Sequence, residues 1–245
     1  MSRPVKDVAE LTYNGNNPGA VKFGNFINYY SFHSSKERTN NLHPNMFPLK
    51  DNESNSLVCL DIGCNTGELT KDLYFYLKES YGNLDVKILA IDIDPTLIER
   101  ATEDNDITDI TFVTCDIVSD TGRKLIQEYK EEQYKQMYDV IFCFSVTMWI
   151  HINNGDEKLI DLLNFLKDNA RSLIIEPQPW KCYKNAQRRM KRSGKNFELY
   201  ELLKIRDNVD KKIEEILDNN SHTKVYESAS SSWNRKIQSY HLKIK

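Results

Sequence analysis

The stretch 57–68 places the tightest constraint on the fold. It starts as an apolar run, reaches Asp61, and turns through Gly63 and Gly67 before a helical pattern begins. A strand, a glycine turn and a helix in this order leave bare backbone N–H groups where a ligand can lie close. A second apolar run ends in Asp92. In doubly wound α/β folds, an acidic residue at the end of the second strand binds the ribose of the ligand.

The glycine turn departs from the dinucleotide fingerprint, which has glycine at its first, third and sixth positions. Counted from Gly63, the third and sixth positions hold Asn65 and Glu68. Glu68 would set a negative charge beside a pyrophosphate, so we expect a cationic ligand without phosphates. S-adenosylmethionine, a sulfonium with an amino-acid tail, has this character. The alternative is a plain strand–helix turn, which leaves the acids at later strand ends unexplained.

Apolar runs that alternate with helical patterns predict the rest of the fold. We expect strands at 57–62, 87–92, 110–115, 138–145 and 172–176, and helices at 67–80, 95–104, 120–133, 155–168, 183–193 and 209–218. The tail 224–245 is expected to add one or two antiparallel strands. The first four strands are apolar at nearly every position, as strands buried on both faces are. The sequence therefore predicts an α/β, doubly wound, mostly parallel sheet with helices on both faces.

Composition excludes several classes of protein. No apolar run approaches the roughly 18 residues of a membrane span, and the N-terminus lacks the apolar core of a secretory signal. The five cysteines are irregularly spaced without a Cys-x-x-Cys pair, which predicts buried free thiols, a reducing compartment and no metal site. The net charge of −3 means that nucleic acid would have to bind a local patch. We expect a flexible segment over 1–22 and one domain over 23–245.

Such a patch follows the fifth strand. It contains seven basic residues and no acid: Lys181, Lys184, Arg188, Arg189, Lys191, Arg192 and Lys195. In a helix over 183–193, Lys184, Arg188 and Lys191 share one face, because they are spaced by four and then three residues. An ordinary solvated helix face is the alternative. We expect this face to bind a phosphate backbone, with a steep dependence on salt.

Four strings carry a resemblance to a known family. They are Phe23-Gly-Asn-Phe, Asp61-Ile-Gly-Cys-Asn65, Trp149-Ile-His151-Ile-Asn153-Asn-Gly-Asp156 and Glu176-Pro-Gln-Pro-Trp180. Together they resemble the bicoid-interacting-protein family of RNA methyltransferases, which methylate a 5′-terminal phosphate of RNA. The likeness runs from about residue 23 to the C-terminus. It implies a seven-stranded sheet of the class I methyltransferase type with a C-terminal antiparallel strand, and S-adenosylmethionine as cofactor.

Within that family, one kind caps a nuclear RNA at its γ-phosphate. The other methylates the 5′-monophosphate of small RNAs, chiefly histidine tRNA, with microRNA precursors as a further candidate. This chain is similar to the second kind, because it is short and has no long insertion before its basic helix. The resemblance implies a cytoplasmic, monomeric enzyme with an RNA partner. A 5′-triphosphate acceptor, a non-RNA substrate and a non-catalytic RNA-binding module are the alternatives.

The cofactor site is expected around the first three strand ends. We expect Asp92 to accept from the ribose hydroxyls, and Gly63, Asn65 and Gly67 to form the turn under the methionine tail. The other candidates are Asp61, Ile93, Asp116, Ile117 and Phe144. The resemblance adds Arg38 as a partner of the cofactor carboxylate, with an exposed salt bridge beside Lys36 as the alternative. Asp94 is expected to cap the helix that starts at Pro95.

The acceptor needs no general base, because a phosphate monoester has its second pKa near about 6 and is already an anion. The RNA candidates are His151, Asn153, Glu176, Gln178, Trp180, Lys181, Lys184, Arg188, Arg189, Arg192 and Tyr29. A structural role for His151 is an equal alternative, and Trp180 either stacks on the terminal base or plugs the loop. Tyr29 and Tyr30 either close over the site or simply pack.

Overall fold

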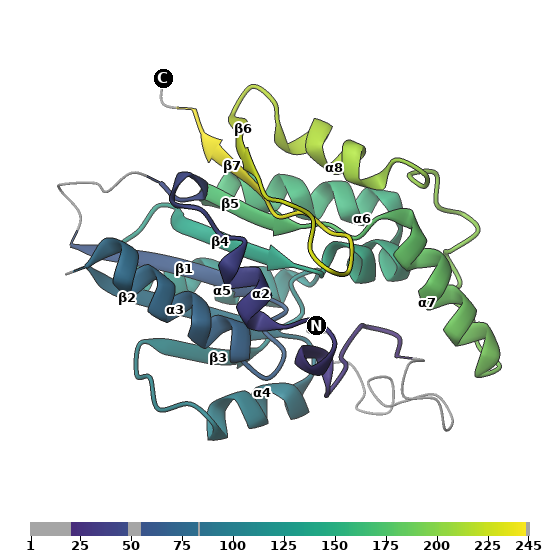
Figure 1. Cartoon of the computed structure of the whole chain (residues 1–245), viewed down its shortest axis with the longest axis horizontal. Coiled ribbons are helices and arrows are strands. Elements are labelled where there is room, and N and C mark those ends of the chain that lie inside the picture. Colours follow the sequence, from purple (N-terminus) through teal and green to yellow (C-terminus); the bar gives the residue numbers. More distant parts are fainter. Residues whose placement is uncertain (1–20, 49–54, 83, 244–245) are drawn as a thin grey trace.

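One seven-stranded sheet organises the chain. The computed structural model describes residues 21–48, 55–82 and 84–243, and its strands lie in the order β3-β2-β1-β4-β5-β7-β6 (Figure 1). The strands are β1 (Ser56–Ile62), β2 (Asp85–Asp92), β3 (Ile110–Thr114), β4 (Tyr138–Phe144), β5 (Ala170–Glu176), β6 (His222–Glu227) and β7 (Gln238–Leu242). Strands β1 to β5 pair in parallel, and β7 pairs antiparallel with both β5 and β6. The predicted fold class is confirmed, including the antiparallel C-terminal strand.

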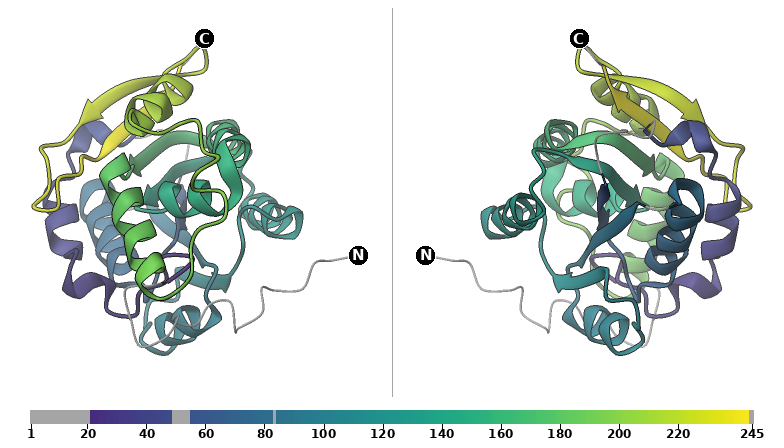
Figure 2. Two further views of the ribbon diagram at one scale, coloured as in Figure 1. Left: turned by 90° about the vertical axis from the view of Figure 1, so that its right-hand side faces the viewer. Right: turned by 90° about the vertical axis from the view of Figure 1, so that its left-hand side faces the viewer.

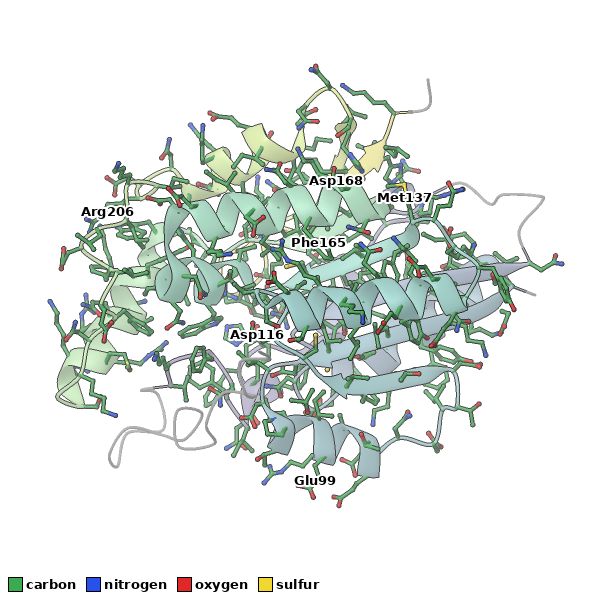
Figure 3. All side chains as sticks on the ribbon, turned by 180° about the vertical axis from the view of Figure 1, so that it is seen from behind. Glu99, Asp116, Met137, Phe165, Asp168 and Arg206 are labelled. Carbon is green, nitrogen blue, oxygen red and sulfur yellow. The ribbon has the colours of Figure 1, made fainter. Side chains whose placement is uncertain are left out.

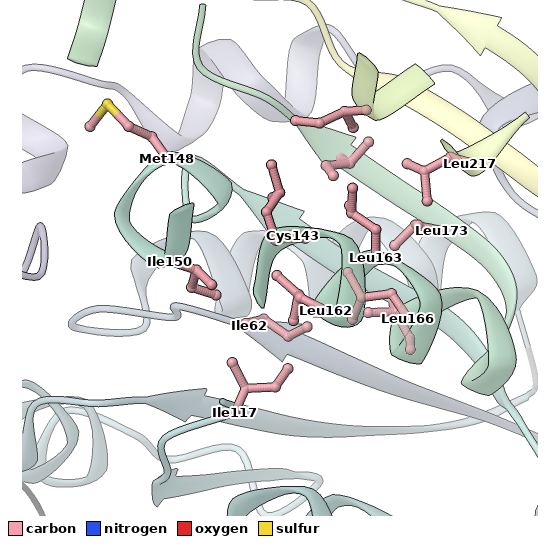
Figure 4. Packing of buried hydrophobic residues seen from close by; sticks show 14 of the residues in the cluster. Ile62, Ile117, Cys143, Met148, Ile150, Leu162, Leu163, Leu166, Leu173 and Leu217 are labelled. Carbon is pink, nitrogen blue, oxygen red and sulfur yellow. The ribbon is translucent and has the colours of Figure 1, made fainter. Parts of the chain in front are cut away.

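Helices cover both faces of the sheet (Figure 2). They are α2 (Ser35–Asn40), α3 (Glu68–Tyr81), α4 (Pro95–Glu103), α5 (Asp120–Glu132), α6 (Thr147–Asn169), α7 (Trp180–Arg192) and α8 (Val209–Leu217), with short 3-10 turns η1 (Tyr29–Ser31) and η2 (Pro44–Met46). Successive side chains of a strand point to opposite faces. Leu60 therefore packs in one buried cluster, with residues of α5, α6 and α8, whereas Cys59 packs in another, with α3, α4 and η2. Figure 4 shows part of the first cluster, where Leu162 and Leu166 of α6 lie over the sheet.

Helix α6 begins eight residues earlier than the sequence predicted. It runs from Thr147 to Asn169 and is interrupted at Gly155, whose φ of 87° and ψ of 175° break the helical path. The sequence assigns no helix to residues 147–154. The structure makes them the first half of a kinked helix, which follows β4 directly.

The segment ahead of β1 is tied to the ends of the strands. Most of the predicted flexible stretch 1–22 lies outside the described residues, but Val21 is buried and the carbonyl of Lys22 accepts a hydrogen bond from Asn153. Further along, Asn25 Nδ2 donates to Asp94, and Asn65 Nδ2 donates to the carbonyl of Phe26. This segment therefore covers the carboxyl ends of the first strands.

Two smaller predictions are also settled. Asp94 caps α4, because its Oδ1 accepts from the N–H of Thr96 and Pro95 takes the first helical position. All five cysteines are free, and four of them are buried. No helix in the described ranges combines the length and the apolar character that a membrane crossing requires.

Candidate functional site

A cavity lies at the carboxyl ends of β1 to β4, where ligands bind in open α/β sheets. Together with the open space at its mouth it measures about 770 Å³. We call it the first cavity. Its lining includes seven of the predicted cofactor residues, namely Gly63, Asn65, Asp92, Ile93, Asp116, Ile117 and Phe144. Figure 3 labels Asp116, which follows β3.

The turn after β1 forms the floor of the first cavity. The N–H groups of Gly63 and Cys64 both donate to the carbonyl of Ile91, which joins the turn to the end of β2. Gly63 has a φ of +76°, and a Cβ there would lie 2.4 Å from Val146 Cγ2, so only glycine fits. Gly67 starts α3 with a φ of +80° but faces the ring of Phe112. Of the two glycines, Gly63 lines the cavity and Gly67 shapes the turn from behind.

Asp92 stands at the rim with two backbone partners. Its Oδ2 accepts from the N–H of Asn65 and its Oδ1 from the N–H of Asp94, both at 3.0 Å. Burial is the main reason that the pKa of this carboxyl rises to about 6. A carboxylate has about four lone-pair sites, so two remain for hydroxyl donors of a ligand.

Asp61, near the end of β1, bonds to a residue of α3. It does not line the first cavity; its Oδ2 accepts a hydrogen bond from Thr70 Oγ1 at 2.6 Å, which fixes α3 against β1. Burial raises its pKa to about 6 as well. Asp61 therefore orients the turn, and its contact with the cofactor stays a prediction.

The structure gives Arg38 a different place from both roles that the sequence predicted, namely a partner of the cofactor carboxylate and a member of an exposed salt bridge. It lies on α2 outside the lining of the first cavity, and its side chain is 1% exposed. Its guanidinium bonds Tyr29 Oη at 2.6 Å and Ser145 Oγ at 3.1 Å, and it pairs with Glu176 Oε2 at 3.0 Å. The arginine is thus neither in an exposed salt bridge nor aimed at the first cavity. It is half of a buried ion pair at the tip of β5.

A second, larger cavity adjoins the first. It encloses about 1530 Å³ with its mouth, and Tyr29, Ser145 and Trp149 line both cavities. Its other lining residues are Phe26, Phe32, His33, Met148, Gln178, Pro179, Lys181, Cys182, Asn185, Arg189, Trp233, Asn234 and Arg235. No carboxylate occurs among these described lining residues, whereas Lys181, Arg189 and Arg235 are cationic. The second cavity therefore suits an anion.

Four of the predicted RNA residues line this second cavity: Tyr29, Gln178, Lys181 and Arg189. Gln178 also braces it, since its Nε2 donates to the carbonyl of Ser145 and its Oε1 accepts from the N–H of Met148. Lys184, Arg188 and Arg192 are exposed on α7, which stands beside the cavity and faces the viewer in the left view of Figure 2. The expected helix exists and is longer at its start than predicted.

His151 is placed away from both cavities. It is fully buried, its Nδ1 lies 3.0 Å from Tyr183 Oη and its Nε2 lies 2.8 Å from Asp156 Oδ1. Asp156 in turn accepts from the N–H groups of Lys204 and Ile205. Burial lowers the pKa of the imidazole. Both ring nitrogens are occupied, so the structural alternative holds and the predicted phosphate contact is corrected.

Asn153 and Trp180 are corrected in the same way. Asn153 Nδ2 bonds the carbonyls of Lys22 and Trp149, which holds the N-terminal segment to α6. Trp180 is 6% exposed and stacks on Tyr200 with ring centroids 5.3 Å apart. It is the hydrophobic plug rather than a platform for a base.

The sequence analysis missed several lining residues. Trp233 and Arg235 come from the segment between β6 and β7, His33 lies between η1 and α2, and Ser145 lies between β4 and α6. Trp233 Nε1 donates to Glu176 Oε1 at 3.1 Å, and Arg235 Nη1 donates to Ser145 Oγ at 2.6 Å. Glu176 thus acts beneath the cavity as a shared acceptor and does not itself line it. An isolated Trp and Arg in a strand-like tail carry no spacing signal that could have revealed this.

The first cavity fits S-adenosylmethionine. Among the described residues that line it there is no lysine or arginine, as expected for a cationic ligand without phosphates. Asp92 would hold the ribose hydroxyls, Asp116 and Ile117 would lie at the adenine, and the turn with Gly63 and Asn65 would lie under the methionine tail. The close approach that Gly63 permits is the structural feature that such a cradle requires.

Comparisons with known proteins agree with this site. The family model for bicoid-interacting protein 3 (Bin3) matches residues 138–242, and a methyltransferase-domain model matches residues 60–172. The pre-miRNA 5′-monophosphate methyltransferase of Xenopus laevis is 36% identical over 90% of this chain and 92% of its own length. The RNA 5′-monophosphate methyltransferase of Bos taurus is 37% identical over 82% of this chain and 73% of its own.

Among solved structures, the N-methyltransferase NodS from Bradyrhizobium japonicum covers 89% of this chain and 99% of its own, with a TM-score of 0.51 at 12% identity. LepI in complex with S-adenosylmethionine covers 84% of this chain and 48% of its own, with a TM-score of 0.52 at 12% identity. These two likenesses concern the fold. Together with the methyltransferase-domain model, they identify the fold as that of a class I methyltransferase. This chain belongs to the bicoid-interacting protein 3 family and is an S-adenosylmethionine-dependent methyltransferase.

Proposed function

We propose that this protein methylates the 5′-monophosphate of a small RNA. The observation that carries the proposal is the junction of two cavities of opposite character. The first has carboxylates at its rim and no cationic lining residue, and the second has cationic lining residues and no carboxylate. Tyr29, Ser145 and Trp149 belong to both, so a donor in one and an anionic acceptor in the other would meet beside these three residues.

The chemistry asks little of the protein beyond alignment. S-adenosylmethionine, when bound, supplies an electrophilic methyl group on a sulfonium. A terminal phosphate near neutral pH is already deprotonated, since its second pKa is about 6. The residues around Ser145 therefore need to hold the phosphate and exclude water, without removing a proton. Orientation alone can supply up to about 7–11 kcal/mol in favourable intramolecular cases.

The basic face of α7 supports an RNA acceptor rather than a small phosphate. Lys184, Arg188 and Lys191 are exposed on one side of a helix whose first turns flank the second cavity. An RNA held by its end in the cavity would pass this face with its next phosphates. The phosphates closest to this basic face would be attracted most strongly, because the potential of exposed charges decays within a Debye length of about 8–10 Å.

We propose histidine tRNA as the first candidate RNA and microRNA precursors as the second, acting with a monomeric enzyme in the cytoplasm. Relatives in Xenopus laevis and Danio rerio are named for pre-miRNA, and those in mammals for RNA 5′-monophosphate more generally. Competition between the two RNAs at equal concentration would rank them by kcat/KM.

The deciding experiment uses labelled cofactor and one RNA sequence with three different 5′ ends. We expect label on the 5′-monophosphate and none on the 5′-hydroxyl. Preferred transfer to the 5′-triphosphate would assign the protein to the capping kind of activity instead. Equal transfer to a dephosphorylated RNA, or transfer to a small molecule or protein only, would overturn the proposal.

A further inference from the structure

The turn between β6 and β7 carries a cationic side chain into the second cavity. Ser228 and Ile237 pair at its base, and the N–H of Ser231 donates to the carbonyl of Arg235 at 2.8 Å. Ser232 bonds Glu37 through both its N–H and its hydroxyl, which fastens the turn to α2. In Figure 1 this turn reaches from the end of the sheet toward α2. The turn is therefore held from both sides.

Arg235 joins a buried cluster at the tip of β5. Its side chain is 10% exposed and its Nη1 lies 3.6 Å from Glu176 Oε2, which also pairs with Arg38. Ser145 Oγ accepts from both guanidinium groups and donates to Glu176. Ser145 holds a φ of +60°, which is unusual for a residue with a side chain. Such backbone conformations cluster at functional sites.

The charges of this cluster do not balance. Among the described residues, Glu176 is the one carboxylate that pairs with Arg38 and Arg235, which leaves one positive charge unmatched. Arg189 and the exposed Lys181, both on α7, add further positive charge to the cavity wall. His33 adds none at neutral pH, because burial and then the charges of Arg235 and Arg38 lower its pKa to about 4.

The hydrogen bonds are incomplete as well. Within the part of the chain that the structure describes, the Nε atoms of Arg38, Arg189 and Arg235 are buried without an acceptor. Buried donors are normally satisfied, and leaving one unpaired is costly. Arg189 and Arg235 line the second cavity, so an anion there is the acceptor that both the charges and the donors require.

We propose that Arg235 is a positioning residue for the acceptor, and that it holds the terminal phosphate beside Ser145 with Arg189 on the facing wall. This rests on the proposed function and names the group that aligns the phosphate. The unmatched positive charges around Arg235 and Arg189 suit a phosphate dianion. The 5′-hydroxyl end offers no charge, and a singly methylated phosphate offers only one. This binding site for the terminal phosphate, which we call the phosphate seat, should therefore release the monomethyl ester and favour one methyl transfer over two.

The test is a thermodynamic cycle of the double-mutant type, in which the guanidinium of Arg235 and the 5′-phosphate of the RNA are removed separately and together. Binding of RNA with a 5′-monophosphate or a 5′-hydroxyl is measured for the wild type, Arg235→Met and Arg235→Lys. We expect the wild type to favour the phosphorylated end by about 10- to 100-fold, the range for a lost charged hydrogen bond. Arg235→Met should lose most of this preference and Arg235→Lys should keep part of it.

Lys236→Met is the matched control, because Lys236 is the next residue, is half exposed and pairs with Glu227 outside the cavity. It should keep the full preference. Cofactor affinity, measured by calorimetry, should change less than twofold in Arg235→Met, which also shows that the variant is folded. An undiminished preference in Arg235→Met, or loss of cofactor binding by both Arg235 variants, would overturn the positioning role.

The two proposals fail in different ways. A wild type that favours the phosphorylated end but transfers no methyl group to it would refute the proposed function and leave the phosphate seat standing. Methyl transfer to the monophosphate with no coupling between Arg235 and the phosphate would refute the seat alone. The ratio of monomethyl to dimethyl product, read by mass spectrometry, adds a third readout: dimethyl product formed as fast as monomethyl product contradicts the charge balance.

Discussion

Cofactor binding depends most directly on the carboxyl group of Asp92. It lies at the rim of the first cavity with two backbone N–H partners and room for two more donors. We predict that Asp92→Ala lowers the affinity for S-adenosylmethionine by about 100-fold, since hydrogen bonds to a charged group contribute about 1.5–3 kcal/mol each. Calorimetry measures this directly. RNA affinity should hold, and unchanged cofactor affinity would contradict the assignment.

The raised pKa of Asp61 predicts that the stability of the folded chain depends on pH. Its folded pKa of about 6 exceeds its ordinary value of 3.8, so the folded chain binds the proton more tightly. The stability from this proton is complete below pH 3.8 and is lost as the pH rises through about 6. Asp61→Asn has no such proton, so its stability relative to the wild type should increase between pH 4 and 7.

The size of that change is up to about 3 kcal/mol, because each pKa unit corresponds to about 1.4 kcal/mol. Denaturant unfolding of the cofactor-free protein at several pH values gives the curve. Asp106→Asn, at an exposed position, is the control whose difference from the wild type should stay flat. A constant difference for Asp61→Asn would show that this carboxyl titrates alike in both states.

Sequence reasoning reached the residues whose roles follow from local order along the chain. Gly63, Asn65 and Asp92 were found because the end of each parallel strand determines where its next residues lie. The bond from Thr70 to Asp61 was not predicted, because it depends on how α3 packs against β1. Arg38 was assigned to the wrong partner, since Glu176 lies 138 residues away and only folding brings the two together.

At the scale of elements, α7 makes the sharpest prediction. Arg188→Glu combined with Arg192→Glu should weaken RNA binding and make it less dependent on salt, with the slope of log K against log salt reduced by about 1–2. The cofactor affinity should not change. Lys124→Glu combined with Lys211→Glu alters the net charge equally on α5 and α8, and should leave the salt slope as it is. Equal effects of both pairs would mean that only overall charge matters.

The first half of α6 shows why an element can be missed. The sequence predicts no helix before Gly155, in a stretch that carries His151, Asn153 and Asn154. In the fold, His151 and Asp156 bridge the kink to Tyr183 of α7, and Asn153 and Asn154 each bond a carbonyl four residues back. The polar residues hold the helix and its neighbours together. That use depends on partners which no local pattern reveals.

For the whole molecule, the cofactor should act as a clamp between the N-terminal segment and the sheet. Phe23, Gly24 and Asn25 line the first cavity opposite the turn after β1. S-adenosylmethionine at 100 times its Kd should stabilise the folded chain by about 2.7 kcal/mol, or about 5–10 °C in Tm. Differential scanning fluorimetry measures the shift. Asp92→Ala should show almost none, and an equal shift in that variant would argue for binding elsewhere.

The second cavity could not have been predicted as a whole. Its walls come from the N-terminal segment, the start of α6, α7 and the turn between β6 and β7, and the last of these lies about 200 residues along the chain from the first. The sequence predicted the sheet that orders these elements. Which side chains meet above it depends on loops, and loop conformations follow from tertiary contacts rather than from periodicity.

That Tyr29, Ser145 and Trp149 line both cavities has a practical consequence for inhibitor design. A compound that joins an adenosine portion to a phosphonate through a short spacer would occupy both chambers at once. Because the tether makes the second contact intramolecular, its potency could exceed that of either fragment by a factor of about 10²–10⁴. Relatives without an anion-binding chamber beside the nucleoside pocket would gain nothing from the phosphonate, so selectivity would come from the same linkage.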